Sequence, residues 1–234
     1  MTKQNGHHKS LTERFTELLT AEGIDYATSE EGDALLIHGE TEAGSCEGYI
    51  VIEELEAVDL DNSGTMSVRL DFCEVAYVVP VGEIEDEDLP GLLELLVRLN
   101  ESHRIGAYEF NIEERELRFR IYLTLPSGQA IAREHLLLPL YEGISAINTH
   151  HEAFRMVLEE GCDPAHATAE IFALEALEDG DLNEELLERA NALYDLARAR
   201  YAARGEDELL ADLEARLMRL AHQAGEAMTR SLRS

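Results

Sequence analysis

Several features are scarce in this chain of 234 residues, and each scarcity excludes a class of protein. Only three cysteines are present, Cys46, Cys73 and Cys162, and their spacing without a CxxC pair suits a reducing cytoplasm rather than a disulfide scaffold. No run of about 18 apolar residues could span a membrane, and the N-terminus has no signal-peptide core. No GxGxxG or P-loop is present to cradle nucleotide phosphates. We therefore expect a cytoplasmic protein that uses no cofactor.

Positive charge is the second scarce property. The chain has 49 acidic and 19 basic residues, a net charge of −30, and no Lys or Arg between Arg14 and Arg69. Such a negative field repels phosphate backbones and anionic lipids, so nucleic acid and membranes are poor partners. It favours basic or amphipathic polypeptides. A salt-adapted or high-GC host explains the same composition, because only Lys3 and Lys9 are lysines, and the two interpretations are compatible.

The spacing of apolar residues predicts the helix and the strands in the first third of the chain. A helix begins at Leu11, and strands follow at 34–39 and 46–55. A third strand begins at Met66, and the phase of its apolar positions slips near Cys73, which predicts a bulge.

A leucine-rich helix begins at Leu89 and is followed at once by a hairpin that ends at Pro126. Apolar residues cover more of this helix than the single stripe that a sheet requires; they are Leu92, Leu93, Leu95, Leu96 and Leu99. The surplus predicts a second contact surface. Self-association across a two-fold axis would bury it most economically, although the helices at the C-terminus could cover it instead.

The hairpin alternates, with Tyr108 and Phe110 on one side and Arg118 and Arg120 on the outward side of the return strand. The two arginines are expected to pair with neighbouring carboxylates. A long helix follows, which Pro139 is expected to begin or kink.

From residue 163 onward the composition changes to Ala, Leu, Glu and Arg. We therefore expect two parts, an α+β domain over 1–162 and a helical extension over 163–234. The order α-β-β-β-α-β-β-α predicts an antiparallel sheet with helices packed on one face, because a doubly wound sheet would need strands and helices to alternate.

The chain resembles the YbjN-type family of bacterial proteins in this order of elements and in the segments LPGLLELLVRLNESHRIGAYEF and ERELRFRIYLTLPSGQ. The resemblance covers roughly Leu11 to Gly161. It implies a type III secretion chaperone-like fold and a small acidic cytoplasmic protein, dimeric, that binds proteins or takes part in regulation. It brings no catalytic signature with it.

Three groups of residues invite a chemical interpretation. The segment DLDNSGTM from Asp59 resembles a calcium loop, but its twelfth position is Leu70 instead of Glu, so a hairpin turn is favoured. His150 and His151 are adjacent and point about 100° apart on a helix, so we expect His151 to be packed instead of holding a metal.

His38, Cys46 and Cys73 fall on candidate strands and could converge as nucleophile and base, but nothing local favours a low thiol pKa, so buried inert cysteines are favoured. We expect no catalytic, cofactor-binding or metal-binding residues.

The sequence thus favours a non-enzymatic protein-binding protein, chaperone-like or regulatory and homodimeric, that acts through apolar patches on an acidic scaffold. The residues expected to form the protein-binding or dimer surface are Leu92, Leu95, Leu96, Leu99, Tyr108 and Phe110. Two alternatives stay open. One is an enzyme or small-ligand binder with a cleft between the sheet and the C-terminal helices, and the other is a scaffold assembled by those helices.

Overall fold

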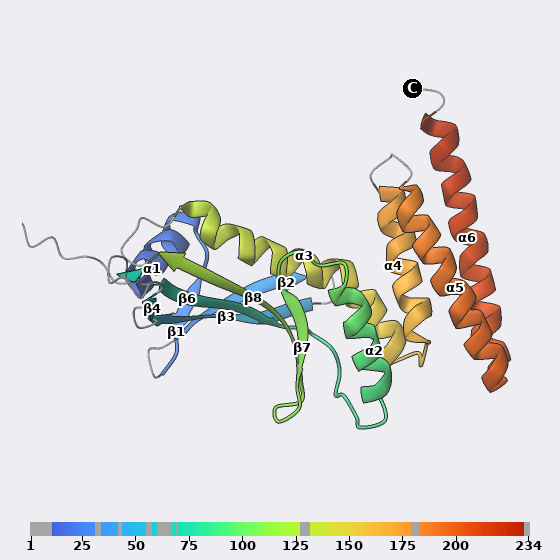
Figure 1. The fold of residues 1–234 in the computed structure, drawn as a ribbon, viewed down its shortest axis with the longest axis horizontal. Helices are drawn as coiled ribbons and strands as arrows, with labels where there is room; N and C mark the ends of the chain where they lie inside the picture. The colour runs from blue at the N-terminus through green and yellow to red at the C-terminus, as the bar shows by residue number, and fades with distance from the viewer. Residues whose placement is uncertain are drawn as a thin grey trace, which may run out of the picture. The chain divides into compact units, whose positions relative to one another are not determined.

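The computed structural model describes residues 11–30, 34–41, 44–54, 58–59, 67–68, 70–126, 132–178 and 183–231 (Figure 1). The helices are α1 (Leu11–Glu22), α2 (Leu89–Asn100), α3 (Arg133–Leu158), α4 (Pro164–Glu178), α5 (Glu184–Arg204) and α6 (Asp207–Ser231). The strands are β1 (Tyr26–Thr28), β2 (Ala34–Thr41), β3 (Gly44–Glu54), β4 (Val58–Asp59), β5 (Ser67–Val68), β6 (Leu70–Val78), β7 (Ala107–Asn111) and β8 (Glu116–Pro126). Among the described helices, none has the length and apolar character needed to cross a membrane.

The chain divides into two compact units. Unit 1 comprises Met1–Pro80 and Arg104–Asn148, and unit 2 comprises Val81–His103 and Thr149–Ser234. Helix α3 therefore contributes its first part to unit 1 and its last part to unit 2. This division differs from the one expected at residue 163, because α2 packs on α4 and so belongs with the C-terminal helices.

Unit 1 is built on a six-stranded antiparallel sheet in the order β1-β2-β3-β6-β8-β7. The sheet and its helices confirm the predicted α+β class. The three-strand meander and the later hairpin join because β8 pairs with β6 on one side and with β7 on the other. Strand β1, only three residues long, was not predicted.

The bulge predicted near Cys73 is wrong. Strand β6 pairs with β8 in one unbroken register from Leu70 opposite Pro126 to Val78 opposite Arg118. The apparent slip in phase arises because the strand is apolar on more than one face: Val75, Ala76 and Tyr77 are all buried.

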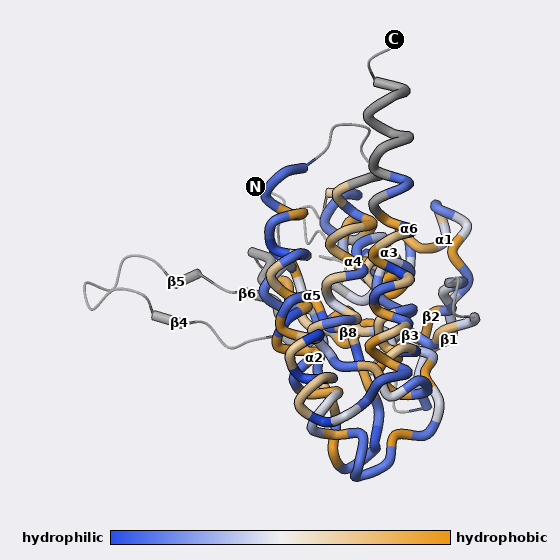
Figure 2. Tube along the Cα trace, turned by 90° about the vertical axis from the view of Figure 1, so that its right-hand side faces the viewer, coloured by the Kyte–Doolittle hydropathy of each residue, from blue (hydrophilic) through white to orange (hydrophobic). Residues whose placement is uncertain are grey.

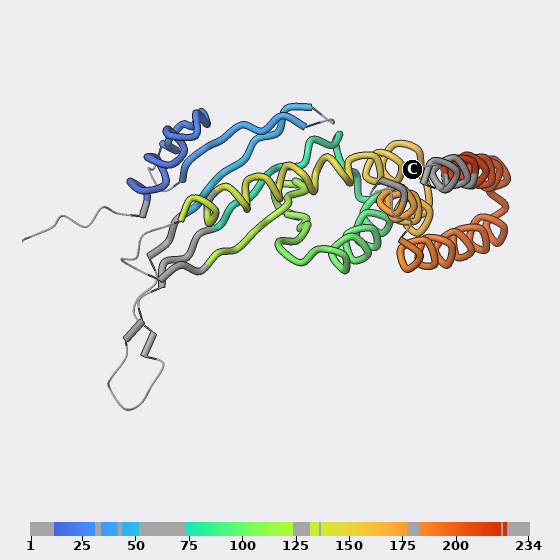
Figure 3. Tube along the Cα trace, turned by 90° about the horizontal axis from the view of Figure 1, so that it is seen from above, coloured from blue at the N-terminus to red at the C-terminus, as the bar shows by residue number. Residues whose placement is uncertain are grey.

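The helices α1 and α3 of unit 1 lie on the same face of the sheet (Figures 1 and 3), and Arg133 at the start of α3 pairs with Glu22 at the end of α1. Close approach of α3 requires glycine. A Cβ atom on Gly143 of α3 would lie 2.5 Å from the Tyr77 ring, and one on Gly48 of β3 would also lie 2.5 Å from it. The helix starts at Arg133 and includes Pro139 in its interior. Of the two roles predicted for Pro139, beginning the helix is therefore wrong, and kinking it stays a prediction.

Unit 2 is helical and contains α2, α4, α5, α6 and the end of α3. Helices α2 and α4 both carry hydrophobic stretches along the trace (Figure 2), and α4 also packs on α5 and α6. Asp163 caps α4, because the backbone N–H of Ala165 donates to Asp163 Oδ1 over 3.0 Å. Gly205, at φ 72°, ends α5 in the left-handed conformation.

Candidate functional site

A hollow of about 300 Å³ lies on the sheet of unit 1, over β1, β2 and β3. Its lining comes from three short segments: Asp25, Tyr26, Ala27, Leu36, Ile37, His38, Glu47 and Gly48. This volume is at the lower end of the range for ligand pockets, roughly 300–1,000 Å³. The hollow therefore has room for one or two side chains rather than for a large cofactor.

The burial pattern along β2 shows on which face of the sheet the hollow opens. Ile37 is buried, whereas Leu36 and His38 on either side of it are exposed. In the register of the sheet, Leu36 lies opposite Tyr49 and His38 lies opposite Glu47. Cross-strand partners project to the same face. These four side chains define the open face of the sheet, which is the face opposite to that of the buried core residues.

His38 and Cys46 are not brought together. Cys46 lies opposite Gly39 on β2, one residue from His38, so its side chain projects from the other face of the sheet, where it is buried. Burial raises the pKa of the Cys46 thiol, which disfavours the nucleophilic thiolate. Burial also raises the pKa of Cys162 to about 11. The prediction of a buried cysteine is confirmed for Cys46, and the side chain of Cys73 lies outside the described residues.

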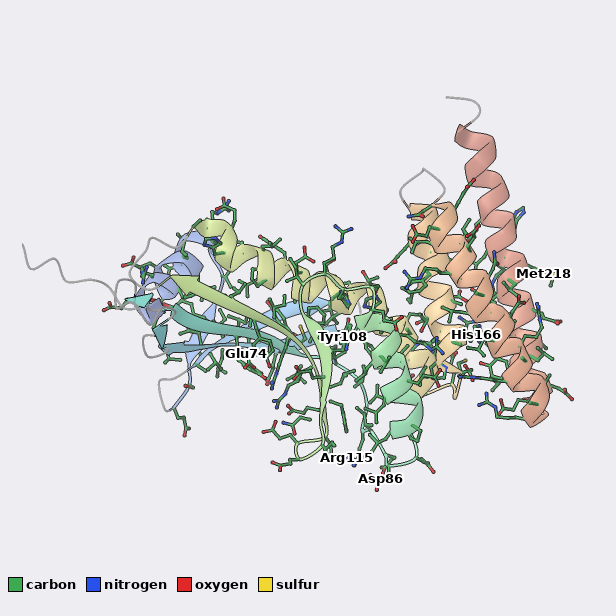
Figure 4. The ribbon with its side chains drawn as sticks, in the orientation of Figure 1. Glu74, Asp86, Tyr108, Arg115, His166 and Met218 are labelled. Carbon is green, nitrogen blue, oxygen red and sulfur yellow. The ribbon has the colours of Figure 1, made fainter. Side chains whose placement is uncertain are left out.

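A second polar cluster lies on the open face, nearer to the β7–β8 hairpin. Arg120 pairs with Glu74 and with Glu109, each at 3.2 Å, and Glu74 lies on the side of the sheet away from α3 (Figure 4). Arg118 pairs with Glu116 at 2.5 Å. The prediction that both arginines pair with neighbouring carboxylates is confirmed. Because their charges are already matched, this cluster is not a ready site for an anion.

The leucine-rich helix α2 turns most of its leucines into unit 2. Leu92, Leu95 and Leu99 are 0% exposed and Leu96 is 5% exposed, and α2 packs on α4. The sequence left open that the appended helices cover these leucines, and this is the arrangement in the structure. A protein-binding role for these four leucines stays a prediction, since they are interior residues in this chain.

Helix α2 nevertheless has apolar surface beyond what its packing uses. Leu93 is 50% exposed and Val97 is 63% exposed. The two residues are four apart, so they form neighbouring positions on one face of the helix. The exposed large apolar side chains of α2 are therefore Leu93 and Val97.

The two aromatic residues expected as anchors differ in their surroundings. Tyr108 is buried, its ring stands edge-on to Phe119 with centroids 4.8 Å apart, and its hydroxyl donates to the Ala146 carbonyl over 2.7 Å. Tyr108 thus ties β7 to α3 inside unit 1. Phe110 is partly exposed. An anchoring role of either residue stays a prediction.

The described residues contain no cluster of three or more His, Cys, Asp or Glu that could hold a metal ion. His150 is buried and packs against the His103 ring with centroids 5.0 Å apart, while His151 is only half-buried. The packed histidine is therefore His150 instead of the predicted His151. The calcium-like segment after Asp59 lies outside the described residues.

A buried polar cluster in unit 2 was not predicted. The Tyr201 hydroxyl accepts the Asp163 backbone N–H over 2.7 Å and lies 3.1 Å from His166 Nδ1. Arg200 reaches Asp163 at 3.1 Å and Glu94 at 2.9 Å. These contacts tie α4 to α5 and α5 to α2. Sequence reasoning missed them because the partners are separated by tens of residues and no local pattern joins them.

The comparisons with known proteins identify a family over more than half of the chain. No curated protein matches the chain. Residues 12–156 match the model of the family YbjN, described as "Putative bacterial sensory transduction regulator". The match spans the whole sheet, α2 and nearly all of α3, which is more than half of the chain. The chain belongs to the YbjN family.

Proposed function

We propose that this protein is a non-enzymatic cytoplasmic regulator that acts by binding another polypeptide, as its membership of the YbjN family suggests. The observation that carries the proposal is the hollow on the open face, where Leu36 is 46% exposed beside His38 and Glu47. An apolar side chain on an otherwise acidic surface suits a polypeptide partner that brings an anchoring side chain. The net charge of −30 disfavours nucleic acid and anionic membranes as partners.

Self-association is the second part of the proposal. The exposed residues Leu93 and Val97 on α2 offer an apolar strip that a second copy of the chain could cover across a two-fold axis. This dimer surface lies in unit 2, whereas the hollow lies in unit 1. The two contacts therefore use different residues and can be tested separately.

One observation favours the small-ligand alternative. The hollow holds His38 close to the carboxylates of Asp25 and Glu47, the kind of arrangement that a ligand-binding or catalytic cleft would use. It is lined by residues of unit 1 alone, unlike the cleft between the sheet and the C-terminal helices that the sequence left open. The thiol of Cys46 does not accompany His38 in the hollow, since it projects from the other face of the sheet.

Site-specific photocrosslinking in the native host tests the polypeptide proposal. A photoreactive amino acid at position 36 is expected to capture one defined polypeptide. Position 138 on α3 is the matched control, because Leu138 is 47% exposed and also lies in unit 1. Leu36→Asp should then weaken binding of the purified partner at least about tenfold, as loss of an interface anchor does, and Leu138→Asp should not.

The proposal fails if position 36 captures no polypeptide, or the same mixture as position 138. A small molecule that copurifies with the wild-type protein and is lost from Leu36→Asp would support the ligand-binding alternative instead.

A further inference from the structure

Two carboxylates border the hollow in a fixed relation to the sheet. Glu47 lies opposite His38 in the β2–β3 register. Asp25 directly precedes Tyr26, which lies opposite Ile37, so the antiparallel ladder places Asp25 next to His38. Asp25, His38 and Glu47 thus form a row across the three neighbouring segments, and all three are exposed.

This part of the sheet has no basic residue of its own to balance that charge. Residues 15–68 contain fourteen Asp or Glu and no Lys or Arg. Within the described residues, the carboxylates of Asp25 and Glu47 form no ion pair and no side-chain hydrogen bond. Elsewhere on the same face, Glu74 and Glu109 are both matched by Arg120. The open face is therefore charge-matched near β8 and left anionic at the hollow.

The apolar part of the hollow lies beside the carboxylates. Leu36 and His38 are two residues apart on β2 and project to the same face, and Ala27 lies opposite Leu36 in the register. A side chain entering the hollow thus meets an aliphatic surface and then two carboxylates. Lys and Arg have this construction, with an alkyl stem that packs on apolar surface and a cationic head.

The other kinds of side chain fit less well. A purely apolar side chain would take the carboxylates partly out of water without giving them a partner, which costs free energy. An acidic side chain would be repelled by Asp25 and Glu47.

We propose that the hollow recognises a basic side chain, Arg or Lys, of the partner polypeptide. The inference rests on the proposed function and adds to it the chemical class of the anchor. The alkyl stem lies along Leu36 and Ala27, and the cationic head lies above the row, facing Asp25 and Glu47 on either side of His38. A partner is thereby selected by a basic residue, and chains that present only acidic or apolar side chains are disfavoured.

Titration of the isotopically labelled full-length protein with two small probes tests the inference. The probes are acetyl-arginine methylamide and acetyl-norleucine methylamide, followed through the backbone amide resonances of Ala27, Ile37 and Gly48. The arginine probe is expected to give saturable shifts that weaken at high salt, and the norleucine probe should bind at least about fivefold more weakly because it makes no ion pair.

Isosteric variants supply the control. Asp25→Asn with Glu47→Gln removes both charges from the hollow and should raise the dissociation constant for the arginine probe about tenfold. Glu134→Gln with Glu142→Gln removes two exposed charges from α3 in the same unit and should change it less than about twofold.

The outcomes separate this inference from the proposed function. Equal binding of the two probes, or equal effects of the two double variants, overturns recognition of a basic anchor while leaving a polypeptide site in place. No saturable shift with either probe overturns the inference as well. Capture of a polypeptide at position 36 decides the proposed function in either case.

Discussion

At the scale of single residues, the buried histidines of unit 2 make the stability depend on pH. Burial and the nearby His103 lower the pKa of His150 to about 3. Burial and the charge of Arg216 lower the pKa of His166 to about 4. An unfolded histidine takes up a proton near its pKa of about 6.5. In that pH range both rings are still neutral in the folded protein.

The pH dependence of stability follows from the sign of these shifts. Below about pH 6.5 the unfolded chain binds protons that the folded chain does not, so stability falls as the pH falls. Lowering the pH from 7.5 to 5.5 should reduce the free energy of unfolding by about 1 kcal/mol for each of the two histidines. Urea denaturation of wild type, His150→Gln and His166→Gln at both pH values measures this.

In each variant, the difference in unfolding free energy between pH 7.5 and pH 5.5 should be about 1 kcal/mol smaller than in the wild type. His151→Gln is the control, because that ring is only half-buried. An unchanged difference in both core variants would mean that these rings are protonated in the folded state.

Which residues of the hollow lie together could only partly be predicted. His38 and Cys46 were both assigned to strands, but periodicity does not say which residue of one strand lies opposite which residue of the next. The register places His38 opposite Glu47 and Cys46 opposite Gly39. A shift of one residue would have moved Cys46 to the face of His38.

At the scale of elements, α2 shows how far a leucine pattern can be interpreted. The pattern correctly indicated apolar surface on more than one face, since Leu93 and Val97 are exposed while Leu95 is 0% exposed. It could not say which face packs on α4. Leucines two positions apart on one helix thus differ in whether they are exposed or buried.

Matched substitutions on α2 test this division. Leu95→Asp places a charge in the interior of unit 2 and should cost at least about 3 kcal/mol of unfolding free energy. Leu93→Asp should change it by less than about 0.5 kcal/mol and, if α2 mediates self-association, convert the dimer to a monomer. Urea denaturation and sedimentation velocity measure the two effects.

An unchanged sedimentation coefficient for Leu93→Asp, in a wild-type protein that is dimeric, would reject this face of α2 as the dimer contact. Equal stability of the two variants would contradict the burial of Leu95.

At the scale of the whole molecule, the division into units has a consequence for truncation. A boundary at residue 163 predicts that the chain 1–162 folds normally. The structure instead packs α4 on α2, so removing 163–234 should expose Leu92, Leu95 and Leu99. We expect this truncation to bind an apolar dye and to aggregate.

The chain 1–205 is the matched control, because it keeps α4 and α5 and lacks only α6. It should stay dispersed and bind less dye. A chain 1–162 that sediments as a single species with the stability of the full chain would show that the expected boundary separates independent domains.

The sequence by itself determined the types of the longer elements, the antiparallel α+β class and the acidity of the segments around the hollow. It could do so because periodicity, turn residues and charge are local properties of a chain. Tertiary structure alone decided that β8 lies between β6 and β7, that α2 is covered by α4 and that Asp25 and Glu47 border one hollow. These arrangements depend on which distant surfaces bury each other, and that choice minimises exposed apolar area over the whole fold.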